Sequence, residues 1–227
     1  MQNRDRPPPR ADEHEEKVLS IRAVVFDYGM VLSSHPDAAA KAKLSELSGL
    51  ASDKLDRFYW LDRLAYDRGE LTGLEFWRKI TSDAGLQLSA SQIAELNYWD
   101  AQMWTTQNEA MLAWQKLLKE RGFQTGILSN MGDSVLDNML QHFAWIEDFD
   151  VLIWSYQHNL AKPEAAIYEL LLARLGTAPE ETLFLDDKLE NVEGARHLGI
   201  QALQFSTIEQ LRQDLITTHL DEWLPLP

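Results

Sequence analysis

The stretch Ile21-Arg22-Ala23-Val24-Val25-Phe26-Asp27-Tyr28-Gly29 carries the clearest structural signal in the chain. It is a β-branched apolar run that ends in an acidic residue and then a glycine, which is the pattern of a buried strand that opens into a loop. Four later apolar runs follow the same rule, at residues 124–128, 150–154, 182–185 and 201–205. The sequence therefore predicts five short strands.

Amphipathic helical patterns separate the later runs, and each ends at a glycine, as helix C-termini commonly do. The terminating glycines are Gly122, Gly176 and Gly199. Pro163 is expected in the first turn of the helix that ends at Gly176, because proline fits that position. Strands that alternate with helices from Gly122 onward predict a doubly wound α/β core, in which a parallel sheet has helices on both faces.

Residues 34–104 break this alternation, because they contain several amphipathic helical windows, many aromatic residues and no convincing strand. We expect them to form an all-helical cap inserted after the first strand. The predicted organisation is a flexible tail at 1–19, a core made of 20–33 and 105–227, and a cap domain at 34–104. The tail is expected to be loose because its charges and its three consecutive prolines cannot bury enough apolar surface.

The composition limits the classes of partner. The 227 residues include 21 Lys and Arg against 36 Asp and Glu, a formal charge of −15, so binding to nucleic acid or to an anionic membrane surface is not expected. The chain has no cysteine, which excludes disulfides, thiolate catalysis and iron–sulfur clusters. No apolar run approaches the roughly 20 residues that cross a bilayer, and no signal peptide is apparent, so a cytoplasmic location is expected. The sequence carries no signal for an oligomeric state.

Polar residues follow the predicted strands, at the edge of a parallel sheet where reactive groups gather. They are Asp27, Ser129, Asn130, Lys162, Asp186 and Asp187. A single such residue is ordinarily a turn former, a helix cap or a solvated lysine. The adjacent pair Asp186-Asp187 is different, because two carboxylates at the end of a buried run repel each other unless a cation lies nearby. Hard oxygen ligands of this kind suit Mg²⁺.

The whole set contains the parts that phosphoryl transfer through an aspartyl-phosphate needs. These are a carboxylate nucleophile, a metal that neutralises phosphoryl oxygens, and a lysine and a hydroxyl that hold the transferring group.

Four segments, in this order, resemble the motifs of phosphatases of the haloacid dehalogenase (HAD) superfamily. The segments are Val25-Phe26-Asp27-Tyr28-Gly29-Met30-Val31-Leu32, Gly126-Ile127-Leu128-Ser129-Asn130, Lys162-Pro163-Glu164 and Phe184-Leu185-Asp186-Asp187. Within the superfamily, the chain is most similar to the sugar-phosphatase branch that includes α-glucose-1-phosphate phosphatases. That similarity depends on Asp27-x-Gly29, on Asp67-Arg68-Gly69-Glu70 and on the fourth motif.

The resemblance implies a role for each matched residue. Asp27 would be the nucleophile, and Ser129 and Lys162 would bind the transferring phosphoryl group. Mg²⁺ would be held by Asp27, the carbonyl of Gly29, Asp186 and Asp187, with the direct ligand of the adjacent pair left open. Asn130 would help to close the phosphate pocket.

The resemblance also implies that the turn between the first two cap helices, around residues 60–66, reaches the substrate through Arg63. The chain departs from the family at Gly29, where most of these phosphatases have a second aspartate that acts as general acid and base. The candidates for a replacement proton donor are His35 and Asp37, which follow the first motif.

The function expected from the sequence is hydrolysis of a small phosphorylated metabolite, such as a sugar phosphate, by a Mg²⁺-dependent enzyme. One alternative is a 2-haloacid dehalogenase, which uses the same fold and the same aspartate but needs no metal. Those enzymes typically replace the acidic pair of the fourth motif, so Asp186-Asp187 favours the phosphatase. A second alternative is a regulatory protein that binds a phosphorylated metabolite and turns it over slowly.

Overall fold

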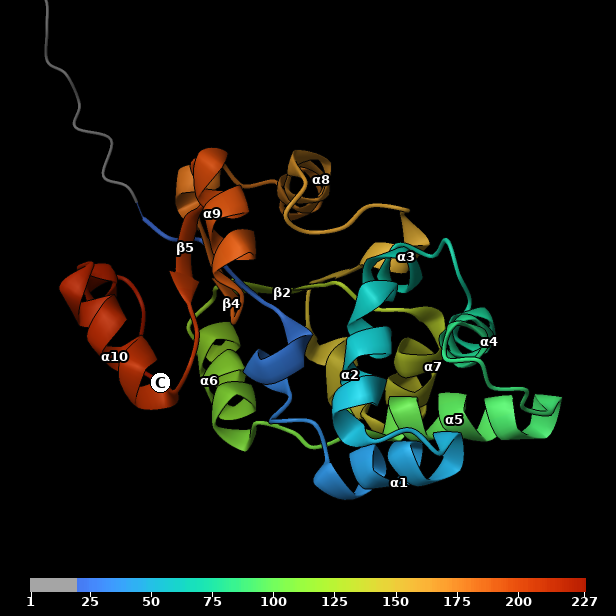
Figure 1. Cartoon of the computed structure of the whole chain (residues 1–227). Helices are drawn as coiled ribbons and strands as arrows, with labels where there is room; N and C mark the ends of the chain where they lie inside the picture. The colour runs from blue at the N-terminus through green and yellow to red at the C-terminus, as the bar shows by residue number, and fades with distance from the viewer. Residues whose placement is uncertain (1–19) are drawn as a thin grey trace, which may run out of the picture.

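The computed structural model describes residues 20–227, in which five strands form one parallel sheet (Figure 1). The strands are β1 (Ala23–Phe26), β2 (Gln124–Ser129), β3 (Val151–Trp154), β4 (Thr182–Asp186) and β5 (Gln201–Gln204). Their order in the sheet is β3-β2-β1-β4-β5. The predicted α/β fold with a parallel sheet is confirmed, whereas the predicted tail at 1–19 lies outside the described residues.

Helices cover both faces of the sheet because successive strand residues point to opposite sides. Val24 and Phe26 of β1 pack with α6 (Glu109–Glu120), α7 (Asp133–His142) and α10 (Ile208–Thr217). The intervening residues Ala23 and Val25 pack on the other face, with α8 (Ala165–Leu175) and α9 (Leu189–His197). The central strand β1 is therefore buried on both sides, which explains why its sequence is continuously apolar.

The start of α8 differs from the sequence prediction, because Pro163 lies before the helix and not in its first turn. Asn130 holds this part of the chain, since its Nδ2 donates to the carbonyl of Lys162 at 2.9 Å and its Oδ1 accepts from the Lys162 amide at 2.8 Å. These two hydrogen bonds tie the backbone of Lys162 to Asn130, in the loop after β2. The helix begins only at Ala165.

Between β1 and β2 the chain forms a helical insertion, residues 38–102. It comprises α1 (Ala38–Ser48), α2 (Ser52–Leu61), α3 (Arg63–Asp67), α4 (Gly73–Asp83) and α5 (Ala90–Gln102). Its helices share an apolar cluster in which Phe76, Trp77 and Leu96 are fully buried. Residues 60–66 join α2 to α3, so this segment is not the turn between the first two helices of the insertion.

The insertion rests on the core through α5, which packs on α7, and through α3. The side chain of Gln102 donates to Asn138 Oδ1 at 2.9 Å, and the ring of Tyr66 lies directly over Gly132. Figure 1 shows α2, α3 and α7 beside the end of β2, so that the insertion faces one end of the sheet. Short helical turns complete the fold at Tyr28–Leu32, Ala144–Asp148, Ser155–Gln157, Pro179–Glu181 and Leu220–Glu222. No helix in residues 20–227 is long and apolar enough to cross a membrane.

The sheet order determines where a ligand can bind. The chain runs from β1 outward through β2 to β3, then returns to the other side of β1 for β4 and β5. In such sheets, ligands bind at the carboxyl ends of the strands where the order reverses. Here that point lies at the end of β1, where Asp27 follows Phe26.

Candidate active site

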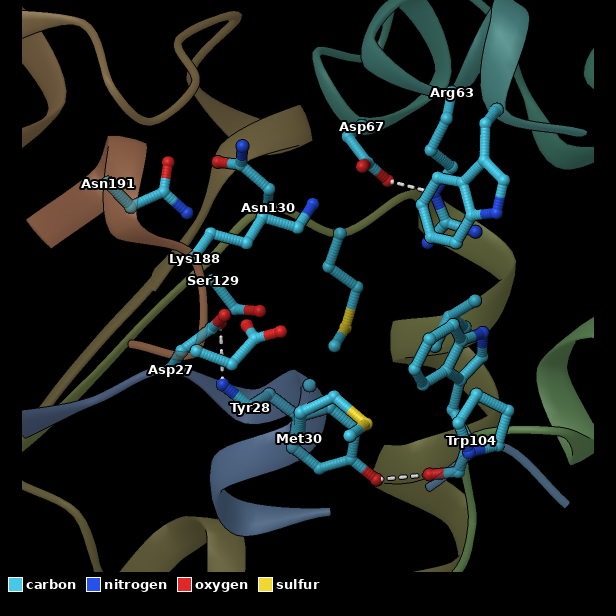
Figure 2. Close-up of a pocket in the computed structure, with 16 residues that line it drawn as sticks. Asp27, Tyr28, Met30, Arg63, Asp67, Trp104, Ser129, Asn130, Lys188 and Asn191 are labelled. Carbon is cyan, nitrogen blue, oxygen red and sulfur yellow. Dashed lines mark hydrogen bonds and ion pairs between the residues drawn. The ribbon is translucent and has the colours of Figure 1, made fainter. Parts of the chain in front are cut away.

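A cavity of about 270 Å³ opens at the carboxyl end of β1, between the sheet and the helical insertion (Figure 2). Six residues predicted from the sequence line it, namely Asp27, Gly29, Arg63, Ser129, Asn130 and Asp187. The two other predicted residues, Lys162 and Asp186, lie just beneath its floor, where both side chains are fully buried. The structure therefore brings all the predicted site residues into one region.

The chain turns sharply after β1 and leaves Asp27 at the floor of the cavity. The amide of Asp27 continues the ladder to β4 by donating to the Leu185 carbonyl at 2.8 Å, and one carboxylate oxygen accepts from the Tyr28 amide at 2.7 Å. Met30 then takes a left-handed conformation, with φ of 60°, which closes the turn. Asp27 is only 7% exposed, so its carboxylate lies largely outside bulk water.

Lys162 lies between two carboxylates. Its Nζ is 3.0 Å from Asp27 Oδ1 and 2.6 Å from Asp186 Oδ2, and it also donates to the Leu128 carbonyl at 2.9 Å. Three acceptors thus use the three donors of the ammonium group. This arrangement fixes the position of the lysine directly behind the Asp27 carboxylate.

The two adjacent aspartates have different surroundings. Asp186 Oδ1 accepts from the Lys188 amide at 2.9 Å, and both of its carboxylate oxygens accept from Asn191 Nδ2, at 3.0 and 3.1 Å. Asp187 instead lines the cavity and is partly exposed. The Oδ1 atom of Asn191 is buried without a hydrogen-bond partner in the described chain. This unpaired oxygen, like the nearby carboxylates, is an acceptor that favours a cation in the site.

The electrostatics of the site reflect this concentration of buried charge. Burial raises the pKa of Asp27 from 3.8 to about 7, while Lys162 lowers it and the neighbouring Asp186 and Asp187 raise it further. Burial also raises the pKa of Asp187, with Asp186 adding to the effect. Burial alone would lower the pKa of Lys162, but Asp186 and Asp27 outweigh it and hold that pKa above its usual value. One lysine therefore does not neutralise the three carboxylates.

These carboxylates are close enough to bind a single ion. One oxygen from each of Asp27, Asp186 and Asp187 lies within 4.8 Å of the others. Carboxylate oxygens are ligands that Mg²⁺ prefers, and Mg²⁺ usually keeps several waters or phosphate oxygens besides one or two carboxylates. The donor set thus fits a hard divalent cation. A carboxylate beside such a cation and a lysine can act as a nucleophile toward an anionic centre.

Arg63 lies on the insertion side of the cavity, among side chains of its own segment. Its Nε donates to Asp67 Oδ1 at 2.8 Å, and Nη1 donates to the Tyr59 hydroxyl. The guanidinium is also stacked near the rings of Tyr66 and Trp104, at 5.3 and 5.9 Å. Asp67 offsets the charge of Arg63, and both side chains border the cavity.

Several residues at the cavity were not singled out from the sequence as site residues. They are Tyr28, Met30, Pro36, Trp60, Asp67, Trp104, Met131, Val135, Lys188 and Asn191. Some of them stood in segments that the sequence had marked: Tyr28 and Met30 in the first motif, Trp60 in the 60–66 segment expected to reach the substrate, and Asn191 five residues after Asp186. Pro36 and Trp104 reach the cavity through the packing of the chain between β1 and β2 on the core, which no periodicity reveals.

The proposed replacement proton donors do not lie in this cavity. His35 lines a separate hollow with Ser33 and Phe205, and Asp37 caps α1 by accepting from the Ala40 amide at 2.7 Å. Apart from Asp27 and Asp187, the one acidic side chain among the described residues that lines the cavity is Asp67.

Comparisons with known proteins agree with this geometry. The chain is 28% identical over 206 residues to a phosphatase from Mycobacterium tuberculosis, covering 87% of this chain and 93% of that protein. It is 27% identical over 187 residues to an (S)-2-haloacid dehalogenase from a Pseudomonas species, covering 79% of this chain and 80% of the dehalogenase.

Among solved structures, the magnesium complex of a HAD family enzyme from Bacteroides thetaiotaomicron matches with a TM-score of 0.68 and 25% identity. The match covers 82% of this chain and 94% of that enzyme. The model of the haloacid dehalogenase-like hydrolase family matches residues 21–199, which include β1 to β4 and every predicted site residue. The chain therefore belongs to the haloacid dehalogenase-like hydrolases.

Proposed function

We propose that the protein hydrolyses small phosphomonoesters in a Mg²⁺-dependent reaction that passes through an aspartyl-phosphate on Asp27. The observation that carries this proposal is the convergence of Asp27, Asp186 and Asp187 within 4.8 Å of one another, with Lys162 at 3.0 Å from Asp27. The magnesium complex of the related Bacteroides enzyme and the M. tuberculosis phosphatase support it.

In this mechanism, a carboxylate oxygen of Asp27 attacks phosphorus, and the bond between phosphorus and the ester oxygen breaks with its electron pair. The leaving oxygen takes up a proton and departs as an alcohol. Water then attacks the phosphorus of the aspartyl-phosphate, releases inorganic phosphate and a proton, and restores the Asp27 carboxylate. Ser129 holds the phosphoryl oxygens, and the positive charge of Lys162, directly behind Asp27, offsets the charge that develops on them.

The residues that would hold Mg²⁺ are Asp27, Asp187 and the carbonyl of Gly29. Asp187 is favoured over Asp186 as the direct ligand, because Asp187 borders the cavity while both oxygens of Asp186 already accept hydrogen bonds. Asp186 then orients Lys162 from below. When bound, the ion supplies positive charge that neutralises phosphoryl oxygens and brings the anionic nucleophile and substrate together.

The alternative of a 2-haloacid dehalogenase has support from a related Pseudomonas enzyme. The cluster of three carboxylates argues against it, because without a metal Lys188 and Lys162 offset the charge of Asp187 only in part and its pKa stays raised. The regulatory alternative predicts binding of phosphate esters with negligible turnover.

The proposed function is tested by release of inorganic phosphate from p-nitrophenyl phosphate and glucose 1-phosphate, with Mg²⁺ or with excess chelator. We expect turnover only with the metal and none in Asp27→Asn, which keeps the shape of the side chain but removes the nucleophile. His158→Gln, a change in the loop after β3 and outside the cavity, is the matched control and should keep wild-type activity.

Hydrolysis that persists in chelator or in Asp27→Asn would contradict the proposal. Release of chloride from 2-chloropropionate without metal would establish the dehalogenase instead. Tight phosphate binding without turnover would favour the regulatory protein.

A further inference from the structure

Six of the side chains that line the cavity are apolar, and together they are called the apolar wall here. They are Met30, Pro36, Trp60, Trp104, Met131 and Val135. In Figure 2, Asp27, Ser129 and Asn191 lie on one side of the cavity, and Trp104 lies on the other. A phosphate ester bound with its phosphorus in front of Asp27, before the P–O bond breaks, would have its ester substituent on the side away from Asp27, toward this apolar wall.

Most polar groups among the side chains that line the cavity are already engaged with the protein, although Trp104 Nε1 is buried without a hydrogen-bond partner in the described residues. The hydroxyl of Tyr28 donates to the Trp104 carbonyl at 2.5 Å, and the amide of Asn130 is used by the Lys162 backbone. Arg63 donates to Asp67 and Tyr59. A leaving group with many hydroxyls would lose its hydrogen bonds to water here and would find few free partners in exchange, which is unfavourable.

Trp60 forms the edge of the cavity and is 52% exposed, although it is a large apolar side chain. The Nζ of Lys188, from the loop after β4, lies 5.5 Å from the centre of its ring. The edge therefore pairs a cation on the phosphoryl side with an aromatic surface on the leaving-group side. An exposed tryptophan at a cavity edge gains burial when an apolar ligand covers it.

The apolar surface continues beyond the main cavity. A second hollow of about 50 Å³ shares Pro36, Trp60 and Trp104 with it, and the side chains of Leu44 and Leu55 extend its lining into the helical insertion. Lys41 and Asp56 in this lining pair with each other at 2.9 Å, so they too are engaged. A substituent longer than the first cavity thus meets more hydrocarbon.

We propose that the physiological substrate is the phosphate ester of a predominantly apolar alcohol, of the aryl, alkyl or prenyl class, and not a sugar phosphate. The proposal rests on the phosphatase function proposed above and specifies its substrate class. Trp60 and Val135 are the residues that recognise the apolar leaving group.

The test compares two esters that differ in one group, 4-ethylphenyl phosphate and 4-(hydroxymethyl)phenyl phosphate, which are similar in size and in the acidity of the released phenol. We expect kcat/KM to be about tenfold higher for the ethyl compound, because a buried methyl group is favoured and a buried hydroxyl without a partner is penalised. Glucose 1-phosphate should be a poorer substrate than either ester.

Two tryptophan variants test whether Trp60 is the source of the preference for the ethyl ester. Trp60→Ala should reduce the preference for the ethyl compound at least threefold, chiefly through KM. Trp223→Ala removes a tryptophan of similar exposure, 39%, that does not line the cavity, and it should leave the preference unchanged.

Equal or greater kcat/KM for the hydroxymethyl ester or for glucose 1-phosphate would overturn the inference while leaving the proposed phosphatase intact. An unchanged preference in Trp60→Ala would overturn the assignment of the apolar wall. Failure of every ester to release phosphate with Mg²⁺ would instead contradict the phosphatase function itself.

Discussion

Lys162 connects the nucleophile to the fourth strand, because its ammonium group pairs with both Asp27 and Asp186. Its side chain is fully buried, so each of these ion pairs lies in a region of low dielectric where an unpaired charge is costly. The lysine therefore stabilises the resting site and is in place to stabilise charge on a transferring phosphoryl group.

Replacing Lys162 by methionine should lower kcat about 100-fold or more and change KM much less, because the lost interaction strengthens as charge develops in the transition state. Steady-state kinetics on p-nitrophenyl phosphate measure the two constants. Circular dichroism should show that the variant is folded, and Lys188→Met, which removes a cavity lysine without a carboxylate partner, serves as the comparison. A kcat within a few-fold of the wild type for Lys162→Met would show that the lysine has no part in catalysis.

The charge of Asp27 makes the stability of the metal-free protein depend on pH. Burial raises the pKa of Asp27 from 3.8 to about 7, so folding favours its protonated form. The stabilisation associated with that proton is complete below about pH 4 and is lost as the pH rises toward 7. Metal binding requires the carboxylate, and so becomes stronger over the same range.

We therefore expect the rise in Tm on adding Mg²⁺ to be small at pH 5 and much larger at pH 8, and to be smaller and less dependent on pH in Asp27→Asn, which keeps only Asp187 as a carboxylate ligand. Thermal unfolding in chelator and in excess Mg²⁺ measures this difference. A Mg²⁺ effect of equal size at both pH values in the wild-type protein would contradict the raised pKa of Asp27.

Gly29 leaves no acid beside the leaving oxygen, and its backbone, with φ of −60°, accepts any residue. A β-carbon at this position would have Trp104 Cζ3, at 3.9 Å, as its nearest neighbour, so the β-carbon of an aspartate meets no clash. We expect the rate to depend steeply on the acidity of the leaving group, and Gly29→Asp to make that dependence shallower by accelerating poor leaving groups about 10- to 100-fold.

A series of aryl phosphates of graded leaving-group acidity, measured where chemistry limits turnover, gives the slope for each protein. A flat series in the wild type would mean that another group donates the proton, and Asp67 would then be the first acid to replace.

At the level of the elements, the helical insertion is held against the core by close contacts at glycine. A β-carbon on Gly132, in the loop between β2 and α7, would lie 2.1 Å from the ring of Tyr66 in α3. Gly132→Ala must therefore displace α3, which carries Arg63 and Asp67 at the cavity. We expect a loss of about 1–3 kcal/mol in unfolding free energy and a raised KM.

Gly49→Ala is the matched control for this prediction. Gly49 has a left-handed φ of 69° but no atom within 4 Å of a β-carbon, so the substitution should cost about 1 kcal/mol without changing KM. Denaturant unfolding and steady-state kinetics on the two variants separate a loss of stability from a change in KM. A normal KM in Gly132→Ala would show that the position of α3 does not control the cavity.

The strands were predictable from sequence for a physical reason. A parallel strand buried on both faces leaves a continuous apolar run, and the residue that follows it must lie at the sheet edge, so Asp27, Ser129 and Asp186 could be placed together. The 60–66 segment was expected to reach the substrate, and Trp60 and Arg63 do line the cavity. The places of Asp67 and Trp104 could not be predicted, because the angle at which the insertion packs on the core is determined by contacts such as Tyr66 on Gly132. The predicted start of α8 was wrong because the hydrogen bonds from Asn130 hold Lys162 outside the helix, and these two residues lie far apart in the sequence.

On the scale of the whole molecule, the two parts of the chain contribute different chemistry to one cavity. The loops at the carboxyl ends of the strands supply the charged groups that handle phosphate, and the helical insertion contributes Trp60 to the apolar wall, beside Trp104 from the segment that follows α5. The protein carries a net charge of −15, which repels an anionic ester at long range. Binding therefore depends on the local cations and the metal, and on apolar contact with the insertion.

A single-turnover experiment with a ³²P-labelled aryl phosphate, quenched in acid on the millisecond scale, tests whether Asp27 is the nucleophile. We expect labelled protein to appear before labelled phosphate, the label to map to the peptide containing Asp27 and to be released by hydroxylamine, and Asp27→Asn or chelator to abolish it. Label on another residue, or release of phosphate at an undiminished rate in Asp27→Asn, would contradict that role of Asp27.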